Sequence, residues 1–248
     1  MKIVVIGGTG LIGSKLVVEI KKAGHEVVAA SPKSGVDTVT GEGLTEVLRG
    51  ASVVVDVSNS PSWEDAAVLH FFTASTSNLL QREAELGIGH HVALSVVGTQ
   101  RLAQSGYFRA KIAQEKLIKA APVPYSIVHA TQFFEFVQGI ASAATTGDEV
   151  RVPSALIQPI VSDDVVRGML PVVLGAPLND TLEIAGPDIF RLDELLRLHL
   201  AAKKDPRQVV VDPAARYSGA ELSERTLVPE PNAWLGATRF EEWLRGTT

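Results

Sequence analysis

The stretch KIVVIGGTGLIGSKL, residues 2–16, decides the fold of this 248-residue chain. The apolar, β-branched run Lys2–Ile6 predicts a buried strand, and Leu11–Ala23 has the spacing of an amphipathic helix. Between them, Gly8, Gly10 and Gly13 give the G-x-G-x-x-G spacing, in which a helix N-terminus directs free N–H groups at a pyrophosphate. The stretch therefore predicts a dinucleotide-binding turn within a strand–turn–helix unit.

Further along the chain, short β-branched runs alternate with helical segments, which is typical of a parallel sheet covered on both faces. We therefore expect an α/β fold, a doubly wound parallel Rossmann sheet with a small C-terminal α/β substrate-binding region. The predicted strands of the sheet are Lys2–Ile6, Glu26–Ala30, Ser52–Val57, His91–Val96 and Tyr125–His129, and two further helices are Val68–Gly87 and Tyr107–Ala121.

The order of elements is looser after about residue 130. The sequence contains no Ser/Gly-rich linker there, so we expect residues 1–130 to form the dinucleotide-binding core and residues 131–248 to form a substrate-covering region integrated with it. The predicted helices of this region are Phe133–Ala144, Asp163–Leu174, Leu192–Lys203 and Thr238–Arg245, and its strands are Glu149–Val152, Gln158–Val161, Thr181–Ala185 and Gln208–Val211.

The composition excludes several kinds of function. With 23 Lys and Arg against 28 Asp and Glu, the net charge of −5 gives no basic face for nucleic acid, and the absence of Cys excludes thiol chemistry and disulfides. The N-terminus does not read as a signal peptide, and no apolar run is long enough to span a membrane. The adjacent His90 and His91 would point to opposite faces of a strand, so we expect no metal site. We expect a cytoplasmic protein.

The segment AASPKSG, Ala29–Gly35, bears on the choice between NAD and NADP. An acidic residue at the end of the second strand would hold the ribose 2′-hydroxyl of NAD, and none is present. Ser31, Lys33 and Ser34 instead offer hydrogen-bond donors and one positive charge, which suit a 2′-phosphate. The sequence therefore favours NADP(H).

Ser95, Tyr107 and Lys111 form the candidate catalytic set. Ser95 lies near the C-terminal end of a predicted strand, and Tyr107 and Lys111 share a helix face at i and i+4. A Tyr hydroxyl can donate a proton to a carbonyl, a nearby ammonium would lower its pKa from about 10, and a Ser hydroxyl can orient the same oxygen. In a purely structural alternative, Lys111 pairs with Glu115 at i+4, Tyr107 packs at the helix start, and Ser95 is only a hydroxyl at the end of a strand.

Two further features concern burial. Asp56 interrupts the apolar run VVVDVSN and needs a partner if it is buried, but the sequence cannot name that partner. Phe134 and Phe136 are expected in the core, whereas Phe133 is the candidate to line a substrate pocket.

The glycine turn, ALSVVGTQRL, GYFRAKIAQEKLI, VPYSIVHATQFFEF, QPIVSDDV and LEIAGPDIF together resemble an NmrA-like, atypical short-chain dehydrogenase/reductase, from residue 1 to about residue 190. The resemblance implies NADP(H) on the glycine turn, its 2′-phosphate at the loop after the second strand, and Lys111 on the nicotinamide ribose. It also implies that Thr131, Gln132 and Phe133 lie beside the nicotinamide or the substrate. The cofactor-binding residues expected on these grounds are Gly7, Thr9, Gly10, Leu11, Ile12, Gly13, Ser31, Lys33, Val57, Ser58, Asn59, Lys111, Thr131 and Phe133.

The leading hypothesis is an NADPH-dependent reductase of a small carbonyl, quinone or activated alkene, with Tyr107 as the proton donor. One alternative is a catalytically silent, NADP(H)-binding redox sensor that regulates a protein partner, and another is a sugar-nucleotide epimerase or dehydratase. We expect a small-molecule substrate and neither a nucleic-acid nor a membrane partner. Whether the chain forms a homo-oligomer stays open.

Overall fold

The computed structural model describes residues 1–246, which divide into two compact units. The first unit comprises Met1–Ser95, Gly106–His129 and Val166–Leu182, and the second comprises Val96–Ser105, Ala130–Val165 and the chain from Glu183 onward. The expected division at residue 130 remains a prediction. Residues 247 and 248 of the predicted region 131–248 lie outside the described residues.

A seven-stranded sheet contains the predicted strands, and its order is β12-β9-β5-β4-β3-β1-β2. β1 pairs in parallel with both β2 and β3, and β3 pairs in parallel with β4. After β1 the chain forms β2 on one side of it and then crosses over to form β3 on the other side. The strand order therefore reverses between β1 and β3, which is the point where such sheets bind ligands. The predicted doubly wound Rossmann sheet is confirmed. The strands are β1 (Lys2–Ile6), β2 (Glu26–Ala30), β3 (Val53–Asp56), β4 (His90–Val96), β5 (Tyr125–Ala130), β9 (Asp180–Ala185) and β12 (Trp234–Leu235).

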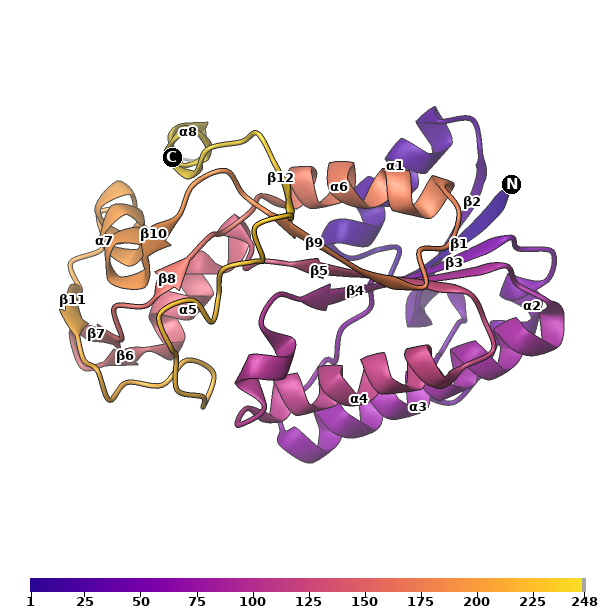
Figure 1. Ribbon diagram of the computed structural model, residues 1–248, viewed down its shortest axis with the longest axis horizontal. Helices are drawn as coiled ribbons and strands as arrows, with labels where there is room; N and C mark the ends of the chain where they lie inside the picture. The colour runs from indigo at the N-terminus through magenta and orange to yellow at the C-terminus, as the bar shows by residue number, and fades with distance from the viewer. Residues whose placement is uncertain (247–248) are drawn as a thin grey trace. The chain divides into compact units, whose positions relative to one another are not determined.

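Helices cover both faces of this sheet, as its continuous apolar strands require. In Figure 1, α3 (Asp65–Leu86) and α4 (Gly106–Ala120) lie side by side on one face, and α1 (Leu11–Lys22) and α6 (Ser162–Leu174) lie on the other. Val4, Val5, Val54 and Val55 are fully buried, so successive residues of β1 and β3 are covered on opposite faces.

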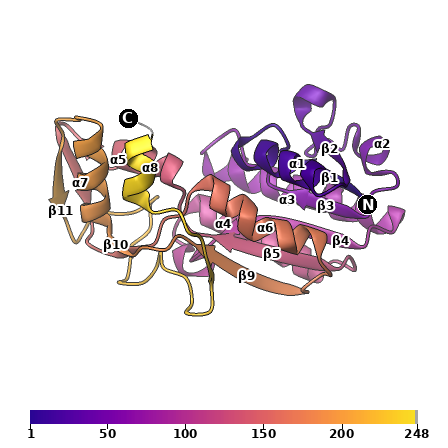
Figure 2. The ribbon, with the colours of Figure 1, turned by 90° about the horizontal axis from the view of Figure 1, so that it is seen from above.

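The second unit is built on smaller sheets. β7 (Glu149–Val152) lies between β6 (Thr145–Thr146) and β11 (Gln208–Val211), and β8 (Leu156–Ile157) pairs with β10 (Phe190–Arg191). Figure 2 shows α7 (Leu192–Ala202) beside β11 and α8 (Phe240–Gly246). The ring of Phe134 packs against Phe240 and Trp243, with centroids 5.0 and 5.5 Å away.

Several sequence-based expectations for secondary structure and burial were wrong. The strand predicted at Gln158–Val161 lies earlier, at β8, because Pro159 has no N–H to donate to a ladder. The helix predicted at Phe133–Ala144 begins as a short 3-10 turn and continues as α5 (Val137–Ala143). Phe136, expected in the core, is 54% exposed. The short helix α2 (Leu44–Leu48) was not predicted.

Candidate functional site

The glycine turn closes tightly between β1 and α1. Gly7 has φ +76°, its N–H donates to the carbonyl of Ala30 at 2.9 Å, and a Cβ on it would lie 2.9 Å from the Cα of Ser58. A Cβ on Gly13 would lie 2.2 Å from the carbonyl oxygen of Gly7. Because backbone occupies both places, only glycine fits there without a shift of the turn.

Gly10 is the N-cap of α1, and the space beside it is largely open. Of the described residues, none caps this helix with a side chain, and its first turn contains no acid. Ser14 makes the first helical bond, to the carbonyl of Gly10 at 3.0 Å, so the N–H groups of Leu11, Ile12 and Gly13 precede the helical ladder. A Cβ on Gly10 would meet just the carbonyl of Gly7, at 3.3 Å. The space and the positive helix end fit a pyrophosphate.

In the loop after β2, two of the three residues predicted to bind a 2′-phosphate have polar groups available for a ligand. The hydroxyl of Ser34 accepts the N–H of Ser31 and donates to its carbonyl, both at 2.9 Å, so it is used within the turn. The hydroxyl of Ser31 is buried without a hydrogen-bond partner among the described residues, and Lys33 is exposed. These two residues fit an added phosphate.

Asp56 at the end of β3 is buried, and the structure identifies its partners. One carboxylate oxygen, Oδ1, accepts the N–H of Ser58 at 3.0 Å and its hydroxyl at 2.6 Å. The other, Oδ2, accepts Nε2 of Gln114 at 3.0 Å. Val57 donates its N–H to the carbonyl of Ile6 at 3.1 Å, and Asn59 Oδ1 accepts the N–H of the next residue at 3.0 Å. Asp56 therefore fixes the segment Val57–Asn59, which is predicted to bind the cofactor, through its two hydrogen bonds to Ser58.

Lys111 is turned into the interior of the first unit. Its Nζ donates to the carbonyl of Leu94 at 3.0 Å and to Oε1 of Gln114, and lies 4.4 Å from the centre of the Phe72 ring. Burial lowers its pKa to about 8, although the carboxylates of Asp56 and Glu115 act in the opposite direction. The ammonium is thus held by α4 and β4, and the alternative in which it pairs directly with Glu115 is not what the structure shows.

Tyr107 lies in an aromatic cluster at the start of α4. Its ring centroid is 5.7 Å from that of Trp63, 6.0 Å from Phe72 and 5.4 Å from Phe108. Burial raises the pKa of Tyr107 to about 12. The sequence-based expectation of a lowered pKa was wrong, because burial dominates the pKa of Tyr107 and the ammonium of Lys111 is hydrogen-bonded to Leu94 and Gln114. The phenol therefore carries its proton throughout the neutral pH range.

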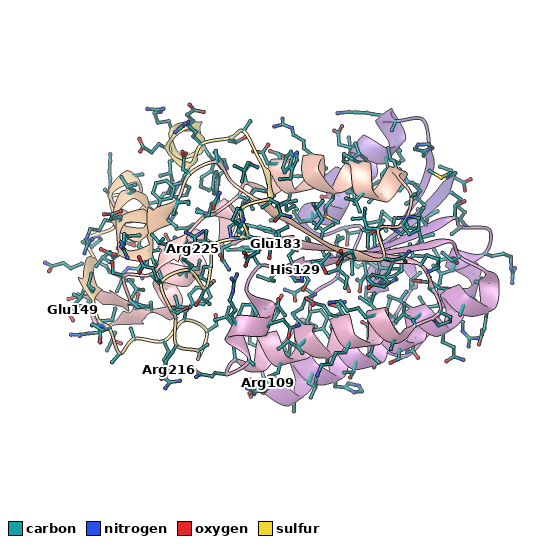
Figure 3. The ribbon with its side chains drawn as sticks, viewed as in Figure 1. Arg109, His129, Glu149, Glu183, Arg216 and Arg225 are labelled. Carbon is teal, nitrogen blue, oxygen red and sulfur yellow. The ribbon has the colours of Figure 1, made fainter. Side chains whose placement is uncertain are left out.

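The hydroxyl of Ser95, on β4, is also engaged. It donates to Oε1 of Glu115 at 2.6 Å, and the same oxygen lies 2.8 Å from Nε2 of His129. His129 lies on β5 and is labelled in Figure 3. Burial would raise the pKa of Glu115, but the hydrogen bonds of His129 and Ser95 hold it below its usual value. Sequence reasoning missed Gln114, Glu115 and His129 as site residues. Their signal was the i+3 and i+4 spacing from Lys111 and the strand-end position of His129.

The remaining predicted site residues belong to the second unit. Thr131 donates its N–H to the carbonyl of Ile184 at 3.1 Å, and its hydroxyl, like both amide atoms of Gln132, is buried without a hydrogen-bond partner among the described residues. The ring of Phe133 stacks on Phe136 at a centroid distance of 5.4 Å. Contacts of Thr131, Gln132 and Phe133 with a cofactor or substrate stay predictions.

Within residues 1–246, no three His, Cys, Asp or Glu side chains gather in a way that could hold a metal ion. Nor does this part of the chain contain a helix with the length and apolar character needed to cross a membrane.

Comparison with known proteins locates a family match in the first unit. Residues 3–70 match the NAD dependent epimerase/dehydratase family. This segment contains β1, the glycine turn, β2 and β3, which are the elements around the candidate pyrophosphate position. The resemblance to the NmrA-like group remains a prediction.

A curated relative is Photosystem II assembly factor Ycf39 of Cyanophora paradoxa, 25% identical over 153 residues that make up 56% of this chain and 48% of the relative. The chain spans about half the length of the curated relatives it matches.

Solved structures match over nearly the whole chain. A dTDP-4-dehydrorhamnose reductase from Bacillus anthracis in complex with NADP has a TM-score of 0.72 at 15% identity, covering 98% of this chain and 96% of that one. A short-chain dehydrogenase/reductase superfamily protein from Agrobacterium tumefaciens with bound NAD has a TM-score of 0.73 at 15% identity, with coverages of 99% and 95%. These likenesses establish the Rossmann fold.

Proposed function

We propose that this chain binds NADP(H) and acts as an NADPH-dependent reductase of a small carbonyl, quinone or activated alkene. The observation that carries the proposal is the glycine turn, in which Gly7 and Gly13 leave no room for a side chain, while Gly10 is the N-cap of α1 and no described side chain caps that helix. A turn of this shape at the switch point of a parallel sheet suits a dinucleotide pyrophosphate.

The preference for NADP(H) over NAD(H) rests on the loop after β2. The hydroxyl of Ser31, buried without a hydrogen-bond partner among residues 1–246, and the exposed ammonium of Lys33 would bind a 2′-phosphate. No acidic residue occupies Ala29–Gly35 to bind the ribose of NAD. Both coenzymes occur in solved proteins of this fold, so the preference is specific to these residues.

When bound, the nicotinamide would supply the hydride. In the proposed mechanism Tyr107 gives its proton to the substrate oxygen, since a phenol with a pKa of about 12 is fully protonated at neutral pH. Ser95 would orient the same oxygen, which requires its hydroxyl to turn away from Glu115. Lys111 would hold the nicotinamide ribose.

A second candidate, a catalytically silent NADP(H)-binding regulator, is favoured by the same hydrogen bonds. The proton of Ser95 and the ammonium of Lys111 are both taken by other protein groups, and no neighbouring charge activates Tyr107. The curated relative from Cyanophora paradoxa is an assembly factor, which favours the same class. A sugar-nucleotide substrate is the third candidate, because one solved neighbour reduces a dTDP-sugar and the matched family is described by epimerases and dehydratases.

One set of measurements separates these candidates. Calorimetric titration with NADP⁺, NADPH and NAD⁺ tests the binding step, and the absence of any binding would overturn all three. NADPH oxidation is then followed with aldehydes, ketones, quinones, enones and dTDP-4-keto sugars. Turnover lost in Tyr107→Phe supports the reductase, whereas tight NADP(H) binding without turnover on any substrate would replace it with the regulator.

A further inference from the structure

A close backbone contact followed by a series of hydrogen bonds connects the glycine turn to Lys111 through two residues that have no role in the predicted site. The backbone of Ser58 lies against Gly7, and both the N–H and the hydroxyl of Ser58 bind Oδ1 of Asp56. Oδ2 of Asp56 accepts Nε2 of Gln114, whose Oε1 accepts Nζ of Lys111. The two ends of this series are the places where the pyrophosphate and the nicotinamide ribose are expected.

The middle of the series is buried and charged. Asp56, Gln114 and Lys111 are 2%, 1% and 2% exposed. A buried carboxylate and a buried ammonium each cost free energy unless they are paired, and here a single amide separates them. Gln114 can serve both because its amide oxygen accepts from the ammonium while its NH₂ donates to the carboxylate. An apolar residue at position 114 would leave both charges without this partner.

We propose that Asp56 and Gln114 are positioning residues of the dinucleotide site, which hold the Val57–Ser58 segment against the glycine turn and fix the location and charge of Lys111. The inference rests on the proposed NADP(H) binding. It predicts that the two residues act on cofactor affinity through Lys111, beyond any contribution that they make to folding.

The charges around Lys111 determine the sign of the expected effect. Asp56 faces it from β3 and Glu115 from α4, while β4 presents the carbonyl of Leu94 and α3 the ring of Phe72. Burial lowers the pKa of Lys111 to about 8, and the two carboxylates raise it. Removing the charge of Asp56 therefore lowers this pKa further, whereas an added carboxylate at position 114 raises it.

The test is the NADP⁺ dissociation constant of the full chain, measured by calorimetry between about pH 7 and pH 9.5, which lies above the second pKa of a phosphate monoester, about 6. Wild-type affinity is expected to weaken above about pH 8, as Lys111 loses its proton. Asp56→Asn should bind NADP⁺ roughly tenfold more weakly than the wild type at pH 7. Its affinity should also begin to fall at a pH about one unit lower than in the wild type. Gln114→Glu should move the loss of affinity to higher pH.

Glu83→Gln is the matched control, because Glu83 is also a fully buried carboxylate of the first unit and is paired with His91. It should lower the unfolding temperature and leave the pH dependence of NADP⁺ affinity in place. If Asp56→Asn does not fold, Gln114→Glu and the isosteric Gln114→Met test the proposal in its place. The apolar Gln114→Met should move the loss of NADP⁺ affinity to lower pH.

Opposite displacements in Asp56→Asn and Gln114→Glu support the proposal, because lost stability alone would not move the pH dependence in two directions. NADP⁺ binding by the wild type with an unmoved pH dependence in both variants would overturn the inference and leave the proposed function intact. No NADP⁺ binding by the wild type would overturn both.

Discussion

The two ends of the candidate site satisfy their polar groups in different ways. At the start of α1, backbone N–H groups precede the helical ladder and no described side chain caps them. On α4, the polar side chains Lys111, Gln114 and Glu115 are hydrogen-bonded to protein groups at the ends of β3, β4 and β5. The first region leaves donors available to a ligand, whereas the second directs its donors and acceptors to the protein itself.

The difference separates binding from chemistry. A backbone turn keeps its geometry whether or not a ligand is present, because glycine positions and helix termini define it. Side chains that already have partners must exchange them before they can act on a substrate, and each exchange costs free energy. The backbone contribution to pyrophosphate binding is therefore expected to be robust, whereas the contributions of Ser95 to turnover and of Lys111 to ribose binding depend on whether these side chains change partners.

The largest effect is expected when the backbone geometry of the glycine turn is disrupted. Gly13→Val places side-chain atoms where a Cβ alone would lie 2.2 Å from the carbonyl of Gly7, so the turn must open. We expect NADP⁺ binding to be lost by at least about 100-fold, as measured by calorimetry, because the N–H groups lose their geometry. The control is Gly139→Ala in α5, where a Cβ has no neighbour within 4 Å. Equal affinities of wild type and Gly13→Val would refute the assignment of the turn.

Tyr107→Phe tests the side-chain region. Loss of a general acid should lower kcat roughly 100- to 1,000-fold, while NADP⁺ affinity and the unfolding temperature stay close to those of the wild type. The ring keeps its contacts with Trp63 and Phe72 in this variant. Tyr125→Phe on β5 is the control for loss of a phenol. Undiminished turnover would remove Tyr107 from the mechanism.

Lys33→Glu sharpens the cofactor assignment. Replacing a phosphate-binding cation with an anion should weaken NADPH by roughly 100-fold and NADH by much less, since a charged hydrogen bond is lost and repulsion is added. Lys116→Glu, an exposed position on α4, controls for the change in net charge. Equal losses for the two coenzymes, measured by fluorescence titration, would place the 2′-phosphate elsewhere.

The smallest effect is expected for Ser95→Ala. The variant removes one hydrogen bond to Glu115 and leaves the bond to His129, so the unfolding free energy should fall by about 1 kcal/mol. If Ser95 orients the substrate, kcat/KM falls roughly tenfold as well. A loss of stability without any change in kcat/KM would assign Ser95 a structural role, as the alternative interpretation of the sequence has it.

Much of the first unit was predictable from the sequence. Strand and helix periodicity located β1, β2, β3, β4, β5, α1, α3 and α4 to within a few residues, because apolar period 2 and period 3.6 are local properties of the chain. The second unit was less predictable where short elements depend on distant partners. The strand expected at Gln158–Val161 lies instead at β8, whose antiparallel pairing with β10 joins residues more than 30 positions apart.

The sequence by itself determined the glycine turn, the Rossmann sheet and the choice of candidate residues, since backbone conformation and hydrophobic pattern act over short stretches. Only the tertiary structure decided what those residues contact. It joined Asp56 to Gln114, 58 positions away, and directed Lys111 to Leu94. It also buried Tyr107, and this burial raises the tyrosine pKa where the sequence predicted a lowered one. Electrostatic environment depends on distance in space and on burial, and both quantities exist only once the chain has folded.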